Sequence, residues 1–380
     1  MLITSLLLSS FMGISYPLIS EYIYSITYSA IAVGFLSSLR SIFGIFFLIL
    51  GGFLADSIGR RKPIWIGTIM LGFSHIIYAI SNDMGWLILA VILEGFSFFY
   101  FPAFSAMIMD STRGNELMRI FTLVLIVDHL PYSLTPIFGG IIRDSYGIVG
   151  LRICFMVSGA LMIIIGIIRW KLLLETLIET RSLHAKMLIE PYIKILNNLR
   201  ELNPLIVKII ALRAFILLSA ISMFYSFSII YAIRYAKVVS FTEWGFVLAI
   251  SSLFYLAVLP LTKFLKKSFY PSILFCEGIS IAVFLIGTKI SILISMILMN
   301  IMGAITYSIE RTILAETTKQ SMRGRGETFM NLSFYFGSFI GGILGGFIYS
   351  INPPLLLMSS SMLLIFGSIL AFILFRKYLQ

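Results

Sequence analysis

Apolar segments of about 20 residues, the length a helix needs to cross a bilayer, recur along the whole chain. Short stretches with charged residues, proline or glycine separate them. The only long hydrophilic interval runs from Lys171 to Asn203. The pattern predicts an all-α membrane protein with twelve transmembrane helices in two six-helix bundles. The predicted helices cover residues 2–24, 29–54, 63–81, 85–109, 116–142, 148–169, 204–233, 241–264, 270–288, 290–316, 327–350 and 354–375.

The same pattern predicts three parts: an N-terminal bundle over 1–170, a linker over 171–203 and a C-terminal bundle over 204–380. Apolar residues such as Leu183 and Met187 recur in the linker at roughly helical spacing among Lys, Arg and Glu. We expect an amphipathic helix on the cytoplasmic membrane surface. A solvated linker or a partner-binding segment would show the same pattern.

Composition supports a membrane protein. Of 380 residues, 59% are hydrophobic and 12% charged, and the mean hydropathy is +1.02. In a polytopic protein the net charge of +11 reflects basic cytoplasmic loops, so nucleic-acid binding is not indicated. Cys154 and Cys276 lie in apolar segments without a ligand pattern, so we expect neither a disulfide nor a metal site.

Cations predict the orientation. Most Lys and Arg residues fall on the side that holds Arg60, Arg61 and the linker. Because basic loops stay inside, we expect a multi-pass protein of the plasma membrane with both termini in the cytoplasm.

The second and third predicted helices are joined by a short basic turn that contains Gly52, Asp56, Gly59, Arg60 and Arg61. Glycine permits close helix approach and the positive φ of a sharp turn. The carboxylate can accept backbone hydrogen bonds or pair with arginine. The positive-inside rule explains the cations, but not the glycines and aspartate at this spacing.

The pattern Gly52-x-x-x-Asp56-x-x-Gly59-Arg60-Arg61 resembles the loop between helices 2 and 3 of the major facilitator superfamily of secondary transporters. The resemblance implies alternating access without a cofactor. It also suggests that Arg60 or Arg61 engages Asp110 and Asp56 as a cytoplasmic latch. The arginine that the family carries on helix 4 is replaced here by Val91, and the second-half loop lacks the glycines and aspartate.

Small residues recur in the fifth and eleventh predicted helices, where they favour close helix packing. Pro136, Gly139 and Gly140 partly match a family run, Gly-Pro-x-x-Gly-Gly, associated with exporters that exchange substrate for protons; Thr135 replaces its first glycine. The second half shows similar glycines, including Gly341 and Gly345.

Charges inside predicted helices are costly in a membrane and therefore usually face a cavity or a partner. Arg40 and Glu94 share a depth and could pair, and the second-half group Arg213, Glu277, Glu310 and Arg311 could pair in the same way. The seven such residues are Arg40, Glu94, Asp128, Arg213, Glu277, Glu310 and Arg311.

Asp128, beside His129, has no arginine at its depth in the first half other than Arg40, and an unpaired carboxylate there suits a group that binds and releases a proton. We predict that Asp128 or Glu94 couples transport to protons; the alternative is that both belong to structural ion pairs. His75 is expected to be a hydrogen-bonded core residue.

By the resemblance, helices 1, 4, 7 and 10 line a substrate cavity. Aromatic side chains and a few charges there suit an amphipathic compound, although aromatic residues also pack against lipid. The candidate cavity residues are Tyr16, Arg40, Glu94, Arg213, Tyr225, Asn300, Tyr307 and Glu310.

We therefore predict a secondary active transporter that exports an amphipathic small molecule in exchange for protons. Proton-coupled uptake of a small nutrient is the nearer alternative, and a polytopic enzyme or receptor the more distant one. No Ser/His/Asp set, metalloprotease motif or phosphate loop supports an enzyme. The expected partners are the substrate, protons and the lipid bilayer, with no cofactor, and we expect a monomer.

Overall fold

The computed structural model describes residues 1–112, 117–177, 192, 201–258, 266–317 and 323–376. Within these ranges all regular structure is helical, which confirms the all-α prediction. Most of the expected amphipathic helix of 171–203 lies outside them. The α-helices are α1 (Leu2–Ser15), α2 (Ile19–Thr27), α3 (Ala30–Ser57), α4 (Arg61–Ile80), α5 (Met84–Ser97), α6 (Tyr100–Asp110), α7 (Leu117–His129), α8 (Thr135–Leu172), α10 (Pro204–Leu212), α11 (Leu218–Ile230), α12 (Phe241–Val258), α13 (Tyr270–Leu285), α14 (Lys289–Thr317), α15 (Arg323–Ile351) and α16 (Pro353–Phe375).

Short irregular turns interrupt several predicted spans. Tyr16–Leu18 and Leu130–Ser133 are 3₁₀ turns that contain a proline, and proline cannot continue the backbone hydrogen-bond ladder. Arg213–Leu217 and Tyr231–Tyr235 are π-helical turns on either side of α11. Such breaks leave the apolar pattern intact, so one predicted span can contain two helices.

Eleven helical segments in the described part of the chain are long and apolar enough to cross a membrane. Twelve were predicted. The difference arises at 116–142 and 148–169, because one segment, Ile126–Leu172, runs through both for 47 residues. Gly147 lies between the two predicted spans with φ 61° and ψ −149°, so α8 is kinked there.

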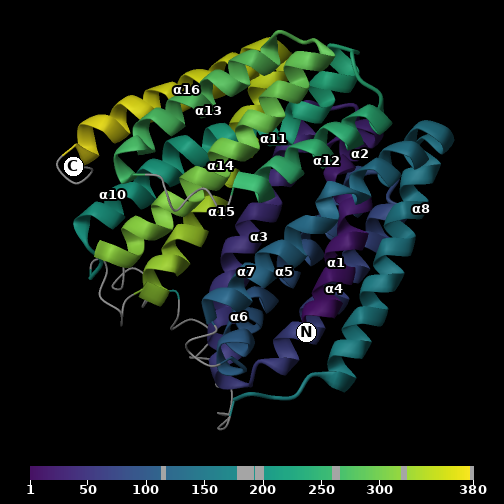
Figure 1. Cartoon of the computed structure of the whole chain (residues 1–380). Helices are drawn as coiled ribbons and strands as arrows, with labels where there is room; N and C mark the ends of the chain where they lie inside the picture. The colour runs from purple at the N-terminus through teal and green to yellow at the C-terminus, as the bar shows by residue number, and fades with distance from the viewer. Residues whose placement is uncertain (113–116, 178–191, 193–200, 259–265, 318–322, 377–380) are drawn as a thin grey trace. The chain divides into compact units, whose positions relative to one another are not determined.

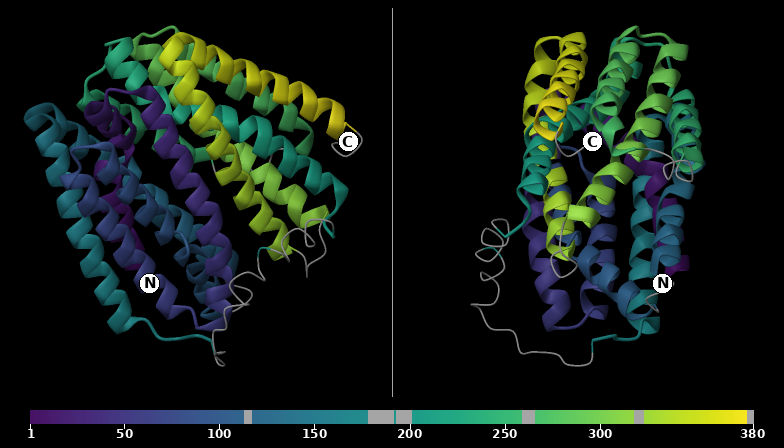
Figure 2. Two further views of the ribbon diagram at one scale, coloured as in Figure 1. Left: turned by 180° about the vertical axis from the view of Figure 1, so that it is seen from behind. Right: turned by 60° about the vertical axis from the view of Figure 1, so that its left-hand side comes forward.

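The chain forms two compact units. Unit 1 comprises Met1–Thr27 and Leu39–Leu196, and unit 2 comprises Tyr28–Ser38 and Asn197–Gln380. In unit 1, α4 packs along α8 and α5, and α1 packs along α8 (Figure 1). In unit 2, α13 packs between α14 and α16, and α11 packs along α15 (Figure 2).

Polar side chains begin several helices. The Asp83 carboxylate accepts hydrogen bonds from the backbone N–H of Gly85 and Trp86 at the start of α5. Asn203 and Asn352 cap α10 and α16 in the same way, each followed by proline in the first turn. These caps satisfy N–H groups that the helix itself leaves unpaired.

Glycines allow backbones to touch inside both units. A Cβ at Gly139 would overlap the carbonyl oxygen of Ile14, and one at Gly341 would overlap that of Ser219. At Gly345 a Cβ would lie 2.9 Å from the Phe227 ring. Pro136 and Gly140, beside Gly139, are buried. Small residues at these positions therefore permit close helix packing.

At the end of α3, close approach occurs at Gly51 and not at Gly52. A Cβ at Gly51 would overlap the Phe99 backbone, whereas at Gly52 its nearest neighbour would be Pro102 Cβ at 3.9 Å. The expectation of a close approach at Gly52 is thus wrong by one residue, because adjacent helix positions point about 100° apart.

This pair of adjacent glycines gives a matched test. Gly51→Ala is expected to destabilise the protein by about 1–3 kcal/mol, the usual cost of overpacking. Gly52→Ala should leave stability unchanged within about 0.5 kcal/mol, as at most open positions. Thermal unfolding in detergent measures both, and equal shifts for the two variants would contradict this packing.

Candidate functional site

The loop between α3 and α4 holds an ion pair. Arg60 Nε lies 2.8 Å from Asp110 Oδ2 at the end of α6. Thr176 Oγ1, just beyond α8, donates to the same carboxylate oxygen at 2.9 Å. The structure thus shows the expected contact between Arg60 and Asp110. The side chain of Asp56, the other expected partner, lies outside the described part.

Glu175 anchors this loop from the segment that follows α8. Its carboxylate accepts the backbone N–H of Arg60 at 2.8 Å and of Arg61 at 3.1 Å, where α4 begins. It therefore caps the N-terminus of α4 from another part of unit 1. Gly59 has φ +96°, and a Cβ there would overlap the Glu175 carboxylate. Gly59 is thus required both for the turn and for the approach of Glu175.

Glu175 was missed by sequence reasoning, and its titration gives a prediction. Burial raises the pKa of the Glu175 carboxyl. Hydrogen bonds from the backbone N–H groups of Arg60, Leu177, Arg61 and Thr176 lower it by more than burial raises it, so the pKa is below the ordinary value. The stabilisation is therefore present above the pKa of an unfolded-chain glutamate, and is lost as pH falls through the lower folded value.

We expect Glu175→Gln to speed amide hydrogen exchange at Arg60 and Arg61 at neutral pH. In the unmodified protein these amides should stay protected until pH falls below the ordinary glutamate range. Exchange corrected for its intrinsic pH dependence measures this. Glu316→Gln, which removes an exposed acid paired with Lys267 in unit 2, is the control. Unchanged exchange in Glu175→Gln would show that the cap does not hold the loop.

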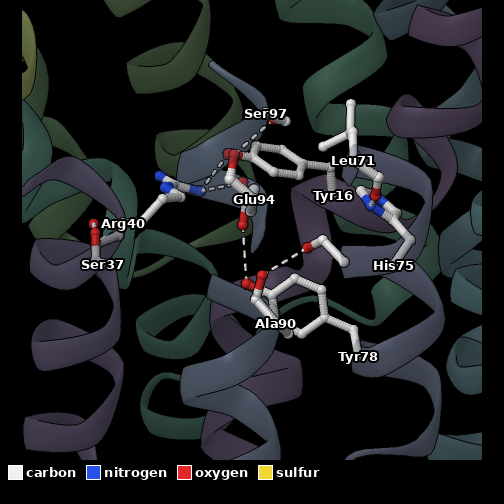
Figure 3. Close-up of polar contacts among 11 residues, drawn as sticks. Tyr16, Ser37, Arg40, Leu71, His75, Tyr78, Ala90, Glu94 and Ser97 are labelled. Atoms are coloured by element: carbon white, nitrogen blue, oxygen red, sulfur yellow. Dashed lines mark hydrogen bonds and ion pairs between the residues drawn. The ribbon is translucent and has the colours of Figure 1, made fainter. Parts of the chain in front are cut away.

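A buried cluster surrounds Glu94 on α5, where only 1% of the Glu94 side chain is exposed. Its Oε1 lies 3.4 Å from Arg40 Nη1, and Tyr78 OH donates to its Oε2 at 2.9 Å. Arg40 Nη1 also donates to Tyr16 OH (Figure 3). The structure therefore pairs Arg40 with Glu94, as their shared depth indicated. An ionised carboxylate is tolerated in a buried site only with such partners.

His75 lies beside this cluster on α4 and is fully buried. Its Nδ1 is 3.0 Å from the carbonyl oxygen of Leu71, and its ring contacts the rings of Tyr78 and Phe155. It is the hydrogen-bonded core residue that the sequence predicted.

Asp128 has different surroundings. It lies in the last turn of α7, one residue before His129 ends the helix ahead of the 3₁₀ turn Leu130–Ser133, and is partly buried. Ser9 Oγ of α1 donates to its Oδ1 at 3.4 Å. Among the residues that the structure describes, no cation lies within ion-pair distance of Asp128. Its carboxylate is thus far less compensated than that of Glu94.

Arg169 on α8 is a buried cation in the same unit. It donates to Thr68 Oγ1 at 2.7 Å, Ser5 Oγ at 3.0 Å and Thr4 Oγ1 at 3.2 Å. Within the described ranges it contacts hydroxyl groups but no carboxylate, and it interacts electrostatically with Asp128. Unit 1 therefore holds an acid and a cation that are near each other but not paired.

Unit 1 also contains a pair that the sequence did not predict. Arg143 Nη2 lies 3.2 Å from Glu21 Oε1, and both are buried. Glu21 follows Pro17 near the end of a predicted span, and Arg143 lies at the boundary of another, so neither stood out as an intramembrane charge.

In unit 2, Arg213 pairs with Glu310, and Tyr270 OH donates to Glu310 Oε1 at 2.9 Å. Arg213 begins a π-helical turn, a distortion that is frequent at functional sites. The other three candidate cavity residues of unit 2 are not part of this pair. Tyr225 is 41% exposed, Asn300 donates to the Met296 carbonyl of its own helix, and the Tyr307 ring lies 4.5 Å from the Arg311 guanidinium.

Charge pairs buried within two apolar, all-helical units define a polytopic membrane transporter, since intramembrane charges mark substrate and ion pathways. The Major Facilitator Superfamily model matches residues 1–286. The chain belongs to this superfamily of small-molecule transporters and is not an enzyme.

Relatives agree with this assignment. The chain is 25% identical over 320 residues to an uncharacterized MFS-type transporter of Methanocaldococcus jannaschii, covering 79% of this chain and 77% of that one. It is 25% identical over 349 residues to multidrug resistance protein MdtH of Proteus mirabilis, covering 90% and 84%. Quinolone resistance protein NorA of Staphylococcus aureus matches 40% of this chain and 38% of its own at 24% identity.

Solved structures show the same fold. A peptide transporter POT in complex with sulfate matches with a TM-score of 0.76 at 14% identity, covering 99% of this chain and 94% of that one. The nucleoside transporter NupG matches with a TM-score of 0.72 at 14% identity, covering 99% and 96%.

Proposed function

We propose that this protein exports an amphipathic small molecule in exchange for protons by alternating access, with Asp128 as the proton-binding group. The observation that carries the proposal is that, among the residues the structure describes, the hydrogen-bond partner of the Asp128 carboxylate is one hydroxyl, Ser9 Oγ, at 3.4 Å. A poorly compensated, partly buried carboxylate takes up a proton more readily than one held by arginine. It can therefore change its protonation state within a transport cycle.

The Arg40–Glu94 pair is proposed to contact the substrate. Arg40 is 26% exposed, while Glu94 behind it is held by Tyr78. Aromatic rings and a charge pair suit a compound that has both apolar and polar parts. The names of two relatives, a multidrug and a quinolone resistance protein, favour export over uptake.

The loop contacts are proposed to act as a cytoplasmic latch. Arg60 binds Asp110, Thr176 binds the same carboxylate, and Glu175 holds the start of α4. These bonds join the segment after α8 to the α3–α4 loop and to α6, all within unit 1, and we infer that they hold the cytoplasmic end of this unit in one arrangement that changes during the transport cycle. We place both termini in the cytoplasm and expect a monomer of the plasma membrane.

The test uses proteoliposomes and a fluorescent quinolone as the probe. An acidic interior should drive probe accumulation, because protons leave as the probe enters, and a proton ionophore should abolish it. Accumulation with an acidic exterior instead would indicate proton-coupled uptake. Flux that is the same with an acidic interior, an acidic exterior and no gradient would reject proton coupling.

A further inference from the structure

Glu277 on α13 is a buried carboxylate that the proposed mechanism does not use. Only 1% of the residue is exposed. Thr306 Oγ1 of α14 donates to Oε1 at 2.7 Å. In the described ranges of the chain, Oε2 has no hydrogen-bond partner. An ionised carboxylate left in this state would pay a large desolvation cost without compensation.

Among the described residues, three other glutamates are equally buried, and each has an arginine. Arg40 lies beside Glu94, Arg143 beside Glu21, and Arg213 beside Glu310; Glu277 has no cation within ion-pair distance in the described ranges. The protein therefore compensates the charge of every other buried glutamate that is described. A neutral, protonated side chain is the form of Glu277 that this environment favours.

We propose that Glu277 is a proton-binding site of unit 2, neutral in this conformation and ionised at another stage of the cycle. The inference rests on the proton-coupled transport proposed above and adds a second proton site to Asp128. On release, the carboxyl O–H bond breaks, the proton passes to water, and the electron pair remains on Glu277.

The groups around Glu277 provide a counter-charge for the ionised form. Arg213 of the π-helical turn, Tyr225 of α11 and Tyr270 of α13 itself interact with it electrostatically. Glu310 lies one helical turn beyond Thr306 on α14 and binds Arg213. The packed helix α16 contains no ionisable residue. Once it has lost its proton, Glu277 would compete with Glu310 for Arg213. Deprotonation of Glu277 would thus be linked to a rearrangement of this cluster.

Infrared spectroscopy of the protein in lipid vesicles tests the protonation directly. At neutral pH the protein should show the carbonyl band of a protonated carboxyl group, shifted by D₂O. Glu277→Gln should lose this band, Glu277→Asp should shift it, and Glu243→Gln, which removes an exposed acid of unit 2, should leave it unchanged. A full band in Glu277→Gln, or no such band in the unmodified protein, would overturn the inference.

The proteoliposome assay then separates this inference from the proposed function. Glu277→Gln should reduce gradient-driven quinolone accumulation to the level of protein-free vesicles, while probe exchange without a gradient continues. If the unmodified protein is active and Glu277→Gln accumulates the probe normally, the coupling role of Glu277 is overturned, while the proposed function stands. If the unmodified protein itself ignores the gradient, the proposed function fails, and the infrared bands still decide whether Glu277 binds a proton.

Discussion

Replacing Asp128 with asparagine is expected to abolish quinolone accumulation under a proton gradient, to the level of protein-free vesicles. Asparagine keeps the size and the hydrogen bond from Ser9, but it cannot bind or release a proton. Gradient-driven flux in proteoliposomes with an acidic interior measures the effect. Exchange of probe across the membrane without a gradient should continue, because the substrate contacts are unchanged.

The conservative control is Asp128→Glu, which keeps a titratable group at this position and should retain part of the gradient-driven flux. Thermal unfolding should be little affected in both variants, because the side-chain hydrogen bond of Asp128 within the described ranges is long, at 3.4 Å. Normal accumulation by Asp128→Asn would remove Asp128 from the proton pathway, and a loss of both accumulation and exchange would assign it to substrate binding instead.

The helices were predictable because the bilayer imposes their length and apolar character. The predicted spans 290–316 and 354–375 correspond to Lys289–Thr317 and Pro353–Phe375 within one residue. The break after Ser97 was not predictable in this way, since the phenylalanines there are as apolar as the flanking helices. A hydrophobic pattern reports burial in lipid, not the continuity of the backbone.

Contacts between charges were predictable only where the membrane restricts them. Arg40 and Glu94 share a depth, and intramembrane charges usually face a partner or a cavity, so their positions favoured a pair. Glu175 lies in a loop 115 residues from Arg60, where no such restriction applies. From the sequence, Glu277 and Glu310 belong to the same group of intramembrane charges. Only the structure distinguishes them, because Arg213 pairs with Glu310 and not with Glu277.

Arg213→Met is expected to destabilise unit 2 by about 3–5 kcal/mol, because removal of one partner leaves the buried charge of Glu310 uncompensated. Glu310 is fully buried, and Tyr270 OH would be its remaining hydrogen-bond donor in the described part of the cluster. Thermal unfolding in lipid nanodiscs measures the loss. As a surface control, Lys289→Met breaks the exposed pair with Glu243 and should cost at most about 1 kcal/mol.

The double variant Arg213→Met with Glu310→Gln should recover most of this stability. Glutamine is neutral and can still accept the hydrogen bond from Tyr270, so no buried charge is left without a partner. If the pair only supports the fold, the double variant should also regain transport. We expect transport to stay impaired, because Arg213 is the cation that must compensate Glu277 when its proton leaves. A double variant with normal gradient-driven accumulation would make the Arg213–Glu310 pair a purely structural one.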